Sequence, residues 1–327
     1  MKQVKLGSQG LSVSAQGLGC MGMSAFYGPS DEAENLATLA RAMELGIDFF
    51  DTAEIYGPFK NEILLAKAFK GKRDKVKIAT KVGSEVSDDG QRGAVNGTPA
   101  YINKAIERSL RHLETDYVDL YYLHRIDPKT PLEDTFGALK RLVEAGKVRY
   151  IGVSEAAAAT IRKGHAIHPI TAVQTEYSLF ERTPEENGVL ATVRELGIGF
   201  VPYSPLGRGL LTGQITKIDD LAPDDFRRSN PRWEGENFDK NLQLVERVRK
   251  IAAAKGATPG QIALAWVMAQ NTVPIPGTRR IKYLEENVGA GDVTLSTADL
   301  AELNEAVPVG ATSGERYPPA GMTALNH

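Results

Sequence analysis

Short runs of β-branched and aromatic residues alternate along this chain with longer segments that carry apolar residues at helical spacing. After a predicted hairpin over residues 4–13, the short runs give eight predicted strands. They cover residues 16–19, 49–51, 77–81, 118–124, 150–154, 172–176, 199–203 and 272–274. Strands that alternate with helices indicate βαβ units and a parallel sheet.

Helical patterns fill the intervals between these strands and follow the last one. Apolar residues at i, i+3 and i+4 predict helices over residues 31–45, 61–70, 99–113, 131–145, 156–164, 185–196, 258–269 and 281–290. Ser30 is the predicted N-cap of the first helix and Gly46 its C-terminal stop. Eight strands and eight helices in alternation are typical of a (β/α)₈ TIM barrel in the α/β class.

Several features lie outside the regular repeat and decorate the predicted barrel. They are the N-terminal β-hairpin, two extra helices over 242–255 and 296–307, and a polar, Arg-, Gly- and Pro-rich segment over 206–240 after the seventh strand. Loops of that length are often functional lids. A barrel accommodates all 327 residues, so we expect residues 1–327 to form one domain.

A glycine run near the N-terminus offers the competing architecture, a doubly wound sheet. Gly17, Gly19 and Gly22 fit the pattern G-x-G-x-x-G. In a dinucleotide fold, however, a helix begins inside that run, whereas residues 23–29 separate it here from the next helix. The run is therefore interpreted as a glycine-rich strand end that a ligand approaches closely, and the barrel is favoured.

Composition limits the functional classes. Lys and Arg number 39 against 41 Asp and Glu, a formal net charge of −2, which argues against a nucleic-acid-binding protein with a basic face. The N-terminus has no signal-peptide pattern, and the longest apolar stretch, 262–269, is too short to cross a membrane. A single cysteine, Cys20, fits a reducing compartment. We expect a cytoplasmic protein, and the sequence indicates no particular oligomeric state.

The carboxyl ends of the strands form the active-site face of a barrel. Asp51 ends the second predicted strand with Tyr56 in the loop beyond it, Lys81 ends the third, and His124 ends the fourth. A phenol has a pKa near 10, and a neighbouring ammonium lowers it. Lys81, kept charged by Asp51, would lower the pKa of Tyr56 in this way. His124 would stabilise a substrate oxygen that gains negative charge. This set suits reduction of a carbonyl, with hydride from a redox cofactor.

Asp51 and Tyr56 lie in one of two longer motifs that resemble the aldo-keto reductase family. Residues 46–57, GIDFFDTAEIYG, match its first signature together with Asn61 and Glu62, and residues 274–280, PIPGTRR, match its cofactor-adenosine signature together with LEEN at 284–287. The run 226–233 resembles a bacterial and plant branch of NADPH-dependent aldehyde and ketone reductases. The resemblance spans nearly the whole chain and implies a barrel that reduces small carbonyl compounds with NADPH.

The resemblance also assigns roles to residues of this sequence. Tyr56, with Asp51, Lys81 and His124, would form the catalytic tetrad and act as the general acid. The dinucleotide would lie along the strand ends. The nicotinamide would meet Ser154, Gln174 and the stacked ring of Tyr203, and the pyrophosphate would meet Ser204, Leu206, Gly207 and Gly209. The 2′-phosphate would meet Thr278, Arg279 and Arg280, and the adenine would meet Glu286 and Asn287. The cofactor-binding residues also include Gly19, Cys20, Met21, Pro205 and Gly277, with no particular part of the cofactor assigned to them. Glu155 departs from the asparagine of many members, which leaves a second carboxamide contact unsupported.

Two arginines at the start of the last barrel helix support the choice of NADPH over NADH. Cations are disfavoured at a helix N-terminus, so Arg279 and Arg280 are easier to explain if they hold a phosphate. His165 and His168 have no third ligand nearby in sequence, so no metal site is predicted. Two alternatives stay open: a cofactor-sensing auxiliary subunit with little turnover, and an enzyme that works in the reverse direction, NAD(P)-dependent alcohol oxidation.

Overall fold

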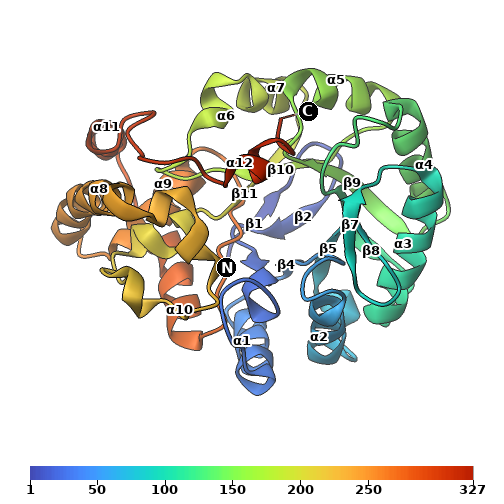
Figure 1. Ribbon diagram of the computed structural model, residues 1–327, viewed down its shortest axis with the longest axis horizontal. Coiled ribbons are helices and arrows are strands. Elements are labelled where there is room, and N and C mark those ends of the chain that lie inside the picture. The colour runs from blue at the N-terminus through green and yellow to red at the C-terminus, as the bar shows by residue number, and fades with distance from the viewer. Residues whose placement is uncertain (327) are drawn as a thin grey trace.

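The computed structural model describes residues 1–326, in which seven parallel strands form the central sheet (Figure 1). Their order around the sheet is β11-β10-β9-β8-β5-β4-β3. The strands are β3 (Leu18–Gly19), β4 (Phe49–Asp51), β5 (Lys77–Val82), β8 (Val118–Leu123), β9 (Val148–Ser154), β10 (Ala172–Glu176) and β11 (Gly199–Tyr203). All seven coincide with predicted strands, some with ends shifted by one or two residues.

An extended segment over 272–277 closes the barrel between β11 and β3. On one side Val273 N–H donates to Phe200 O, and on the other Gly17 N–H donates to Pro274 O, both at 3.0 Å. Gly19 also forms a parallel bridge with Gly277. The eighth strand position is therefore filled where it was expected, but as an irregular ladder, because the prolines at 274 and 276 have no N–H to donate. The predicted (β/α)₈ fold is confirmed.

Helices surround the sheet on its outer side (Figure 1). Those of the repeat are α1 (Glu32–Glu44), α2 (Lys60–Phe69), α3 (Pro99–His112), α4 (Leu132–Glu144), α5 (Ala158–Ile167), the pair α6 (Thr183–Glu186) and α7 (Val189–Glu195), α9 (Pro259–Ala269) and α10 (Ile281–Gly289). The additions are α8 (Gly235–Ala254), α11 (Thr297–Ala306) and the short α12 (Pro319–Met322).

Three details differ from the sequence prediction. Asp31, rather than Ser30, caps α1, because its Oδ1 accepts the Glu34 N–H at 2.8 Å. The helix predicted over 185–196 is divided at Gly188, whose φ of 83° interrupts it. Helix α8 begins seven residues before the predicted 242, since Phe238 in its first turns stacks on Trp233 with ring centroids 5.6 Å apart.

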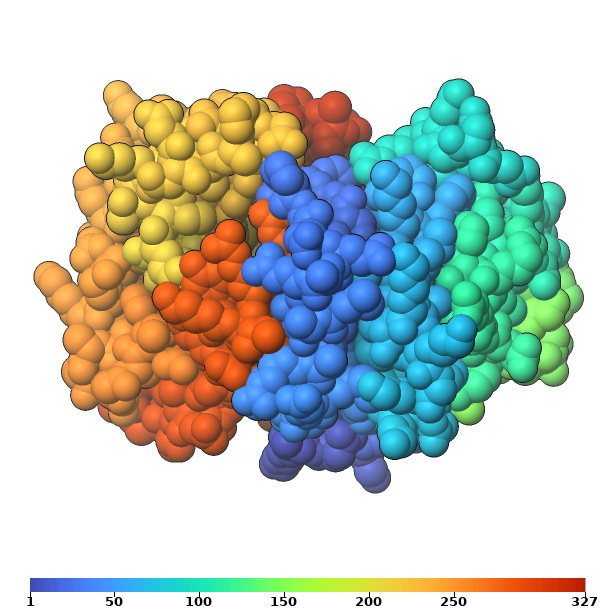
Figure 2. All heavy atoms as spheres, turned by 90° about the horizontal axis from the view of Figure 1, so that it is seen from below, coloured from blue at the N-terminus to red at the C-terminus, as the bar shows by residue number. Residues whose placement is uncertain are grey.

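The N-terminal hairpin, β1 (Gln3–Lys5) and β2 (Ser12–Ser14), covers one end of the barrel. Leu6 and Leu11 from its turn are buried in the core inside the barrel. Gly7 makes this close approach possible: its φ is 74°, and a Cβ there would lie 2.6 Å from Thr171 O. Figure 2 shows this hairpin, in dark blue, at one edge of the molecule.

Three irregular segments gather at the opposite edge (Figure 2). They are the hairpin β6 (Ser84–Val86) and β7 (Arg92–Val95), the segment 206–234 with its short 3₁₀ turns, and the C-terminal tail from 308. No sequence pattern indicated the β6–β7 hairpin. Within residues 1–326, no helix combines the length and apolar character needed to cross a membrane.

Candidate active site

Four polar side chains from consecutive strand ends meet in one buried group. Lys81 Nζ, on β5, lies 2.5 Å from Asp51 Oδ1, 3.1 Å from Tyr56 Oη and 2.7 Å from the carbonyl oxygen of Thr52. The ring of His124 faces the Tyr56 ring edge-on, with centroids 6.0 Å apart. The structure thus brings together the four residues singled out from the sequence, and Lys81 is fully buried among them.

Burial and neighbouring charge set the protonation of this group. Burial lowers the pKa of Lys81, but Asp51 and Tyr56 more than offset it, so that pKa is raised and the ammonium is favoured. Burial raises the pKa of Tyr56, and Lys81 counteracts this only in part. The expectation of a lowered phenol pKa is therefore wrong for the protein alone, because desolvation of the phenolate outweighs the ammonium.

His124 is held neutral. Its pKa lies well below the usual range because the ring is buried and because Arg125 and Lys81 place positive charge nearby. A neutral imidazole carries one N–H, which is available as a hydrogen-bond donor. The group therefore combines a protonated phenol, an ammonium behind it and an uncharged donor beside it.

A cleft of about 1020 Å³ opens from this group along the strand ends. Tyr56, Asp51 and His124 line it, and Lys81 lies behind them. Most of the residues assigned to a dinucleotide also line it. They are Gly19, Met21, Ser154, Gln174, Tyr203, Ser204, Pro205, Leu206, Gly209, Gly277, Thr278, Arg279, Arg280, Glu286 and Asn287.

Two of the assigned residues do not line the cleft. Cys20 is completely buried, and its Sγ lies 3.5 Å from Leu18 O behind the strand end. Gly207 is buried beneath the following turn, where a Cβ would lie 3.3 Å from the ring of Phe180. Neither residue lines the cleft, so the structure does not support direct contact of Cys20 or Gly207 with a ligand there.

Gln174 has a hydrogen-bond partner within the group of four polar residues. Its Nε2 donates to Asp51 Oδ2 at 2.7 Å, so the amide holds the carboxylate on the side away from Lys81. Ser154 Oγ, at the end of β9, accepts a weak bond from Arg125 Nη1 at 3.4 Å. Ser154 and Gln174 line the cleft beside the four polar residues, and Gln174 in addition fixes Asp51.

The far end of the cleft is cationic. Arg280 occupies the N-cap of α10 and is exposed, while the Arg279 guanidinium donates to the carbonyl oxygens of Tyr27 and Gly28 at 3.0 and 3.3 Å. Partial burial and the adjacent Arg280 lower the pKa of Arg279. Two neighbouring cations at a helix N-terminus without a side-chain cap form a set of donors that fits a phosphate group.

The C-terminal tail contributes to the wall of the cleft and is attached beside Tyr203 at the end of β11. Tyr203 Oη donates to Glu155 Oε1 at 2.7 Å and lies 2.9 Å from Tyr317 Oη, so Tyr317 is the donor in that second contact. Arg316 forms a two-pronged ion pair with Glu155 at 2.6 and 2.9 Å. Glu155 does not line the cleft; its departure from the family pattern is explained by its role in holding the tail.

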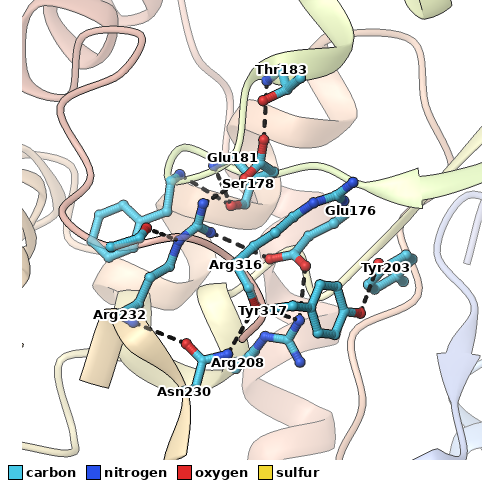
Figure 3. Close-up of polar contacts among 12 residues, drawn as sticks. Glu176, Ser178, Glu181, Thr183, Tyr203, Arg208, Asn230, Arg232, Arg316 and Tyr317 are labelled. Carbon is cyan, nitrogen blue, oxygen red and sulfur yellow. Dashed lines mark hydrogen bonds and ion pairs between the residues drawn. The ribbon is translucent and has the colours of Figure 1, made fainter. Parts of the chain in front are cut away.

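Two further arginines and two further glutamates extend this contact beneath the tail (Figure 3). Arg208 pairs with Glu176 at 2.9 Å, and Arg232 pairs with Glu181 at 2.5 Å. Arg208 and Asn230 also donate to the carbonyl oxygen of Arg316. The segment 206–234 and the tail are therefore joined through buried charged side chains.

Sequence reasoning missed several residues of the cleft. Most come from segments that showed no regular pattern: Phe26, Tyr27, Ser84, Val95, Thr212, Gln214 and Tyr317. Tyr283 lies on α10, whose helix was predicted but not its contribution to the cleft. Only the length and polarity of the 206–240 segment signalled that it could reach a site. Among residues 1–326 no group of three His, Cys, Asp or Glu is placed to hold a metal ion, and His165 Nδ1 accepts the Ile170 N–H.

Comparison with known proteins gives one consistent result. The model of the Aldo/keto reductase family matches residues 17–308. A probable aldo-keto reductase 1 of Glycine max is 47% identical over 325 residues, covering 97% of this chain and 92% of its own length. An aldo-keto reductase of Schizosaccharomyces pombe, named yakc [NADP(+)], is 48% identical over 320 residues, covering 96% and 94%.

Solved structures agree with these sequence relatives. The holo form of an aldo-keto reductase of Bacillus halodurans superposes with a TM-score of 0.80 at 29% identity, covering 95% of this chain and 97% of its own. A glycerol dehydrogenase of Gluconobacter oxydans superposes with a TM-score of 0.85 at 25% identity, covering 97% and 98%.

Proposed function

This chain belongs to the aldo/keto reductase family, and from that premise we propose that it reduces the carbonyl group of a small aldehyde or ketone to an alcohol with NADPH. The observation that carries the proposal is the 3.1 Å contact between Tyr56 Oη and Lys81 Nζ at the floor of the large cleft. A phenol backed by a buried ammonium is equipped to give up a proton and to remain as phenolate for the rest of the step.

The residues of the cleft fit NADPH. The cationic end at Arg279, Arg280 and the start of α10 would hold the 2′-phosphate, and Tyr203, Ser154 and Gln174 lie at the other end beside the four polar residues. The name of the Schizosaccharomyces pombe relative, which includes NADP(+), supports this choice. When bound, NADPH supplies the hydride that the chain itself cannot provide.

Proton delivery falls to the four polar residues. Tyr56 keeps its proton near neutral pH because burial raises its pKa, and the same residue would donate that proton to the carbonyl oxygen. Lys81, held by Asp51, would stabilise the phenolate that remains. His124, neutral and with one N–H, would donate a hydrogen bond to the same oxygen as negative charge develops there.

Alcohol oxidation is the second candidate, because the Gluconobacter oxydans neighbour is a glycerol dehydrogenase. The same four residues would then catalyse the reverse reaction, with Tyr56 as the general base that takes the proton from the alcohol. We further propose that the protein acts in the cytoplasm, since its single cysteine is a free, buried thiol. Its partners would be small molecules.

The test is Tyr56→Phe, assayed with a panel of aldehydes, ketones and alcohols by absorbance of the reduced nicotinamide. We expect carbonyl reduction to fall by about 10²- to 10⁴-fold, the usual contribution of a general acid. The dissociation constant of NADPH, measured by calorimetry, should stay within about twofold, because the phenol does not hold the phosphates. Near-normal turnover by the variant would contradict the assignment of Tyr56, and NADPH binding without any turnover by the wild-type protein would favour an auxiliary, cofactor-sensing role.

A further inference from the structure

A buried carboxylate lies two residues before Tyr56 and faces away from the cleft. Glu54 is 1% exposed. Its Oε1 accepts a hydrogen bond from Tyr101 Oη at 2.8 Å, and its Oε2 accepts one from Arg108 Nη2 at 2.8 Å; both donors come from α3. Each oxygen of the carboxylate thus has its own donor, which fixes the orientation of the side chain and of the loop that carries it.

The same two side chains, Tyr101 and Arg108, also contact the β6–β7 hairpin. Tyr101 Oη accepts the Val86 N–H at 2.8 Å, and Arg108 Nη1 lies 3.1 Å from Asp88 Oδ1 in the turn between the two strands. Tyr101 is the stronger of the two links, because Val86 is buried whereas the Asp88 side chain is 70% exposed. A buried chain of hydrogen bonds therefore runs from Glu54 through Tyr101 to the hairpin backbone.

The hairpin and the loop of Tyr56 form one wall of the cleft. Ser84 and Val95 of the hairpin and Ile55 of the loop line it together with Tyr56. The hairpin also touches the loop directly through Arg92, whose Nη2 lies 3.4 Å from Ile55 O. This contact is long and exposed, so it leaves Tyr101 and Glu54 as the buried attachment.

We propose that Glu54 is a positioning residue: through Tyr101 and Arg108 it fixes the loop of Tyr56 against the β6–β7 hairpin and so sets both the position of the phenol and the wall that the substrate meets. This inference rests on the proposed function for its kinetic consequences. It assigns a purpose to a buried polar cluster that otherwise costs desolvation energy beside an apolar core.

A second buried carboxylate provides a matched control. Glu62, on α2, is completely buried, and its Oε1 accepts a hydrogen bond from Thr80 Oγ1 at 2.7 Å. Its hydrogen bond leads to strand β5 rather than to the hairpin. Its other oxygen lies 3.6 Å from His112 Nδ1 at the end of α3. Glu62→Gln therefore changes a buried carboxyl group of the barrel wall while the hydrogen bonds that join Glu54, Tyr101 and Val86 stay in place.

The experiment compares Glu54→Gln, Tyr101→Phe, the double variant and Glu62→Gln. Tyr101→Phe removes a single oxygen, so it keeps the proposal testable even if Glu54→Gln folds poorly. Hydrogen exchange is measured over residues 84–95 and 52–59, and kcat, KM and the NADPH dissociation constant are measured for one carbonyl substrate. Because exchange needs no turnover, its result does not depend on the proposed function.

We expect exchange in both segments to rise by about fivefold or more in each of the first three variants and to stay unchanged there in Glu62→Gln. Tyr101→Phe should raise KM more than it lowers kcat, Glu54→Gln should lower kcat by about tenfold, and NADPH affinity should stay within about twofold. The double variant should be no worse than the poorer single one, because both remove the same attachment. Unchanged exchange in Tyr101→Phe, or additive kinetic effects, would overturn the proposal. A wild-type protein without carbonyl turnover would refute the proposed function alone.

Discussion

Arg279 and Arg280 stand side by side where α10 begins, and their surroundings differ. The Arg279 guanidinium donates to the backbone at Tyr27 and Gly28, whereas Arg280 is exposed and its Nε lies 4.0 Å from Glu34 Oε1. The Arg280 side chain is therefore the freer of the two to bind a phosphate. Arg279 contributes positive charge and also holds the backbone at Tyr27 and Gly28.

Replacing both arginines with alanine is expected to weaken NADPH by about 10- to 100-fold, since hydrogen bonds to charged groups contribute about 1.5–3 kcal/mol. NADH, which lacks the 2′-phosphate, should lose far less, so the ratio of the two dissociation constants falls. Titration calorimetry with both dinucleotides measures this. Arg280→Ala alone should give most of the change in that ratio, because it leaves the backbone contacts of Arg279 in place. Equal losses for NADPH and NADH would contradict the assignment.

At the level of single residues, the sequence predicts which side chains meet but not their electrostatics. Asp51, Tyr56, Lys81 and His124 could be placed together because strand ends converge in a barrel. The direction of the Tyr56 pKa could not, because it depends on how much of the phenol is buried. The Glu54 contacts were likewise invisible, since Tyr101 and Arg108 lie 47 and 54 residues away in sequence.

Among the elements, regular strands were predicted well and irregular ones poorly. β10 and β11 carry β-branched and aromatic residues that mark them, and their predicted bounds are confirmed. The β7 strand, RGAV, is mostly exposed and shows no alternation, so no pattern revealed it. The tail is attached to the residue that follows β9 through Arg316 and Glu155, 161 residues apart, which only the folded chain shows.

The tail depends on that ion pair. The side chains of Arg316 and Glu155 are 9% and 2% exposed, and removal of one partner from a buried pair costs about 3–5 kcal/mol. We expect Arg316→Ala to let the tail open locally, seen as at least a tenfold rise in hydrogen exchange over residues 311–326. KM for the carbonyl substrate should rise with it, because Tyr317 lines the cleft.

The matched control is Arg162→Ala on α5. Arg162 makes the same two-pronged contact with Glu195, but their side chains are 45% and 60% exposed, so the pair contributes about 0–1 kcal/mol. Exchange in the tail should be unchanged in this variant. A tail equally protected in Arg316→Ala and wild type would show that the other contacts of the tail hold it without the ion pair.

For the molecule as a whole, Glu54 makes stability depend on pH. Burial raises its pKa from 4.5 to about 7, although Arg108 and Tyr101 counteract the shift. The folded state then keeps this proton to a higher pH than the unfolded chain does. Unfolding releases it between about pH 4.5 and 7, so the free energy of unfolding falls as the pH rises through that interval and levels off above it.

Glu54→Gln removes this dependence. Across pH 5 to 8 at constant ionic strength, the wild-type free energy of unfolding in urea should fall relative to the variant, by up to about 3 kcal/mol at 1.36 kcal/mol per pKa unit. Asp299→Asn is the control: Lys255 and the Ser296 cap lower the pKa of Asp299 to about 2, so its contribution is complete above pH 4 and is lost only as the pH falls toward 2. That variant should differ from wild type by a constant amount from pH 5 to 8. A constant difference for Glu54→Gln as well would mean that Glu54 is ionised throughout this range in the folded protein.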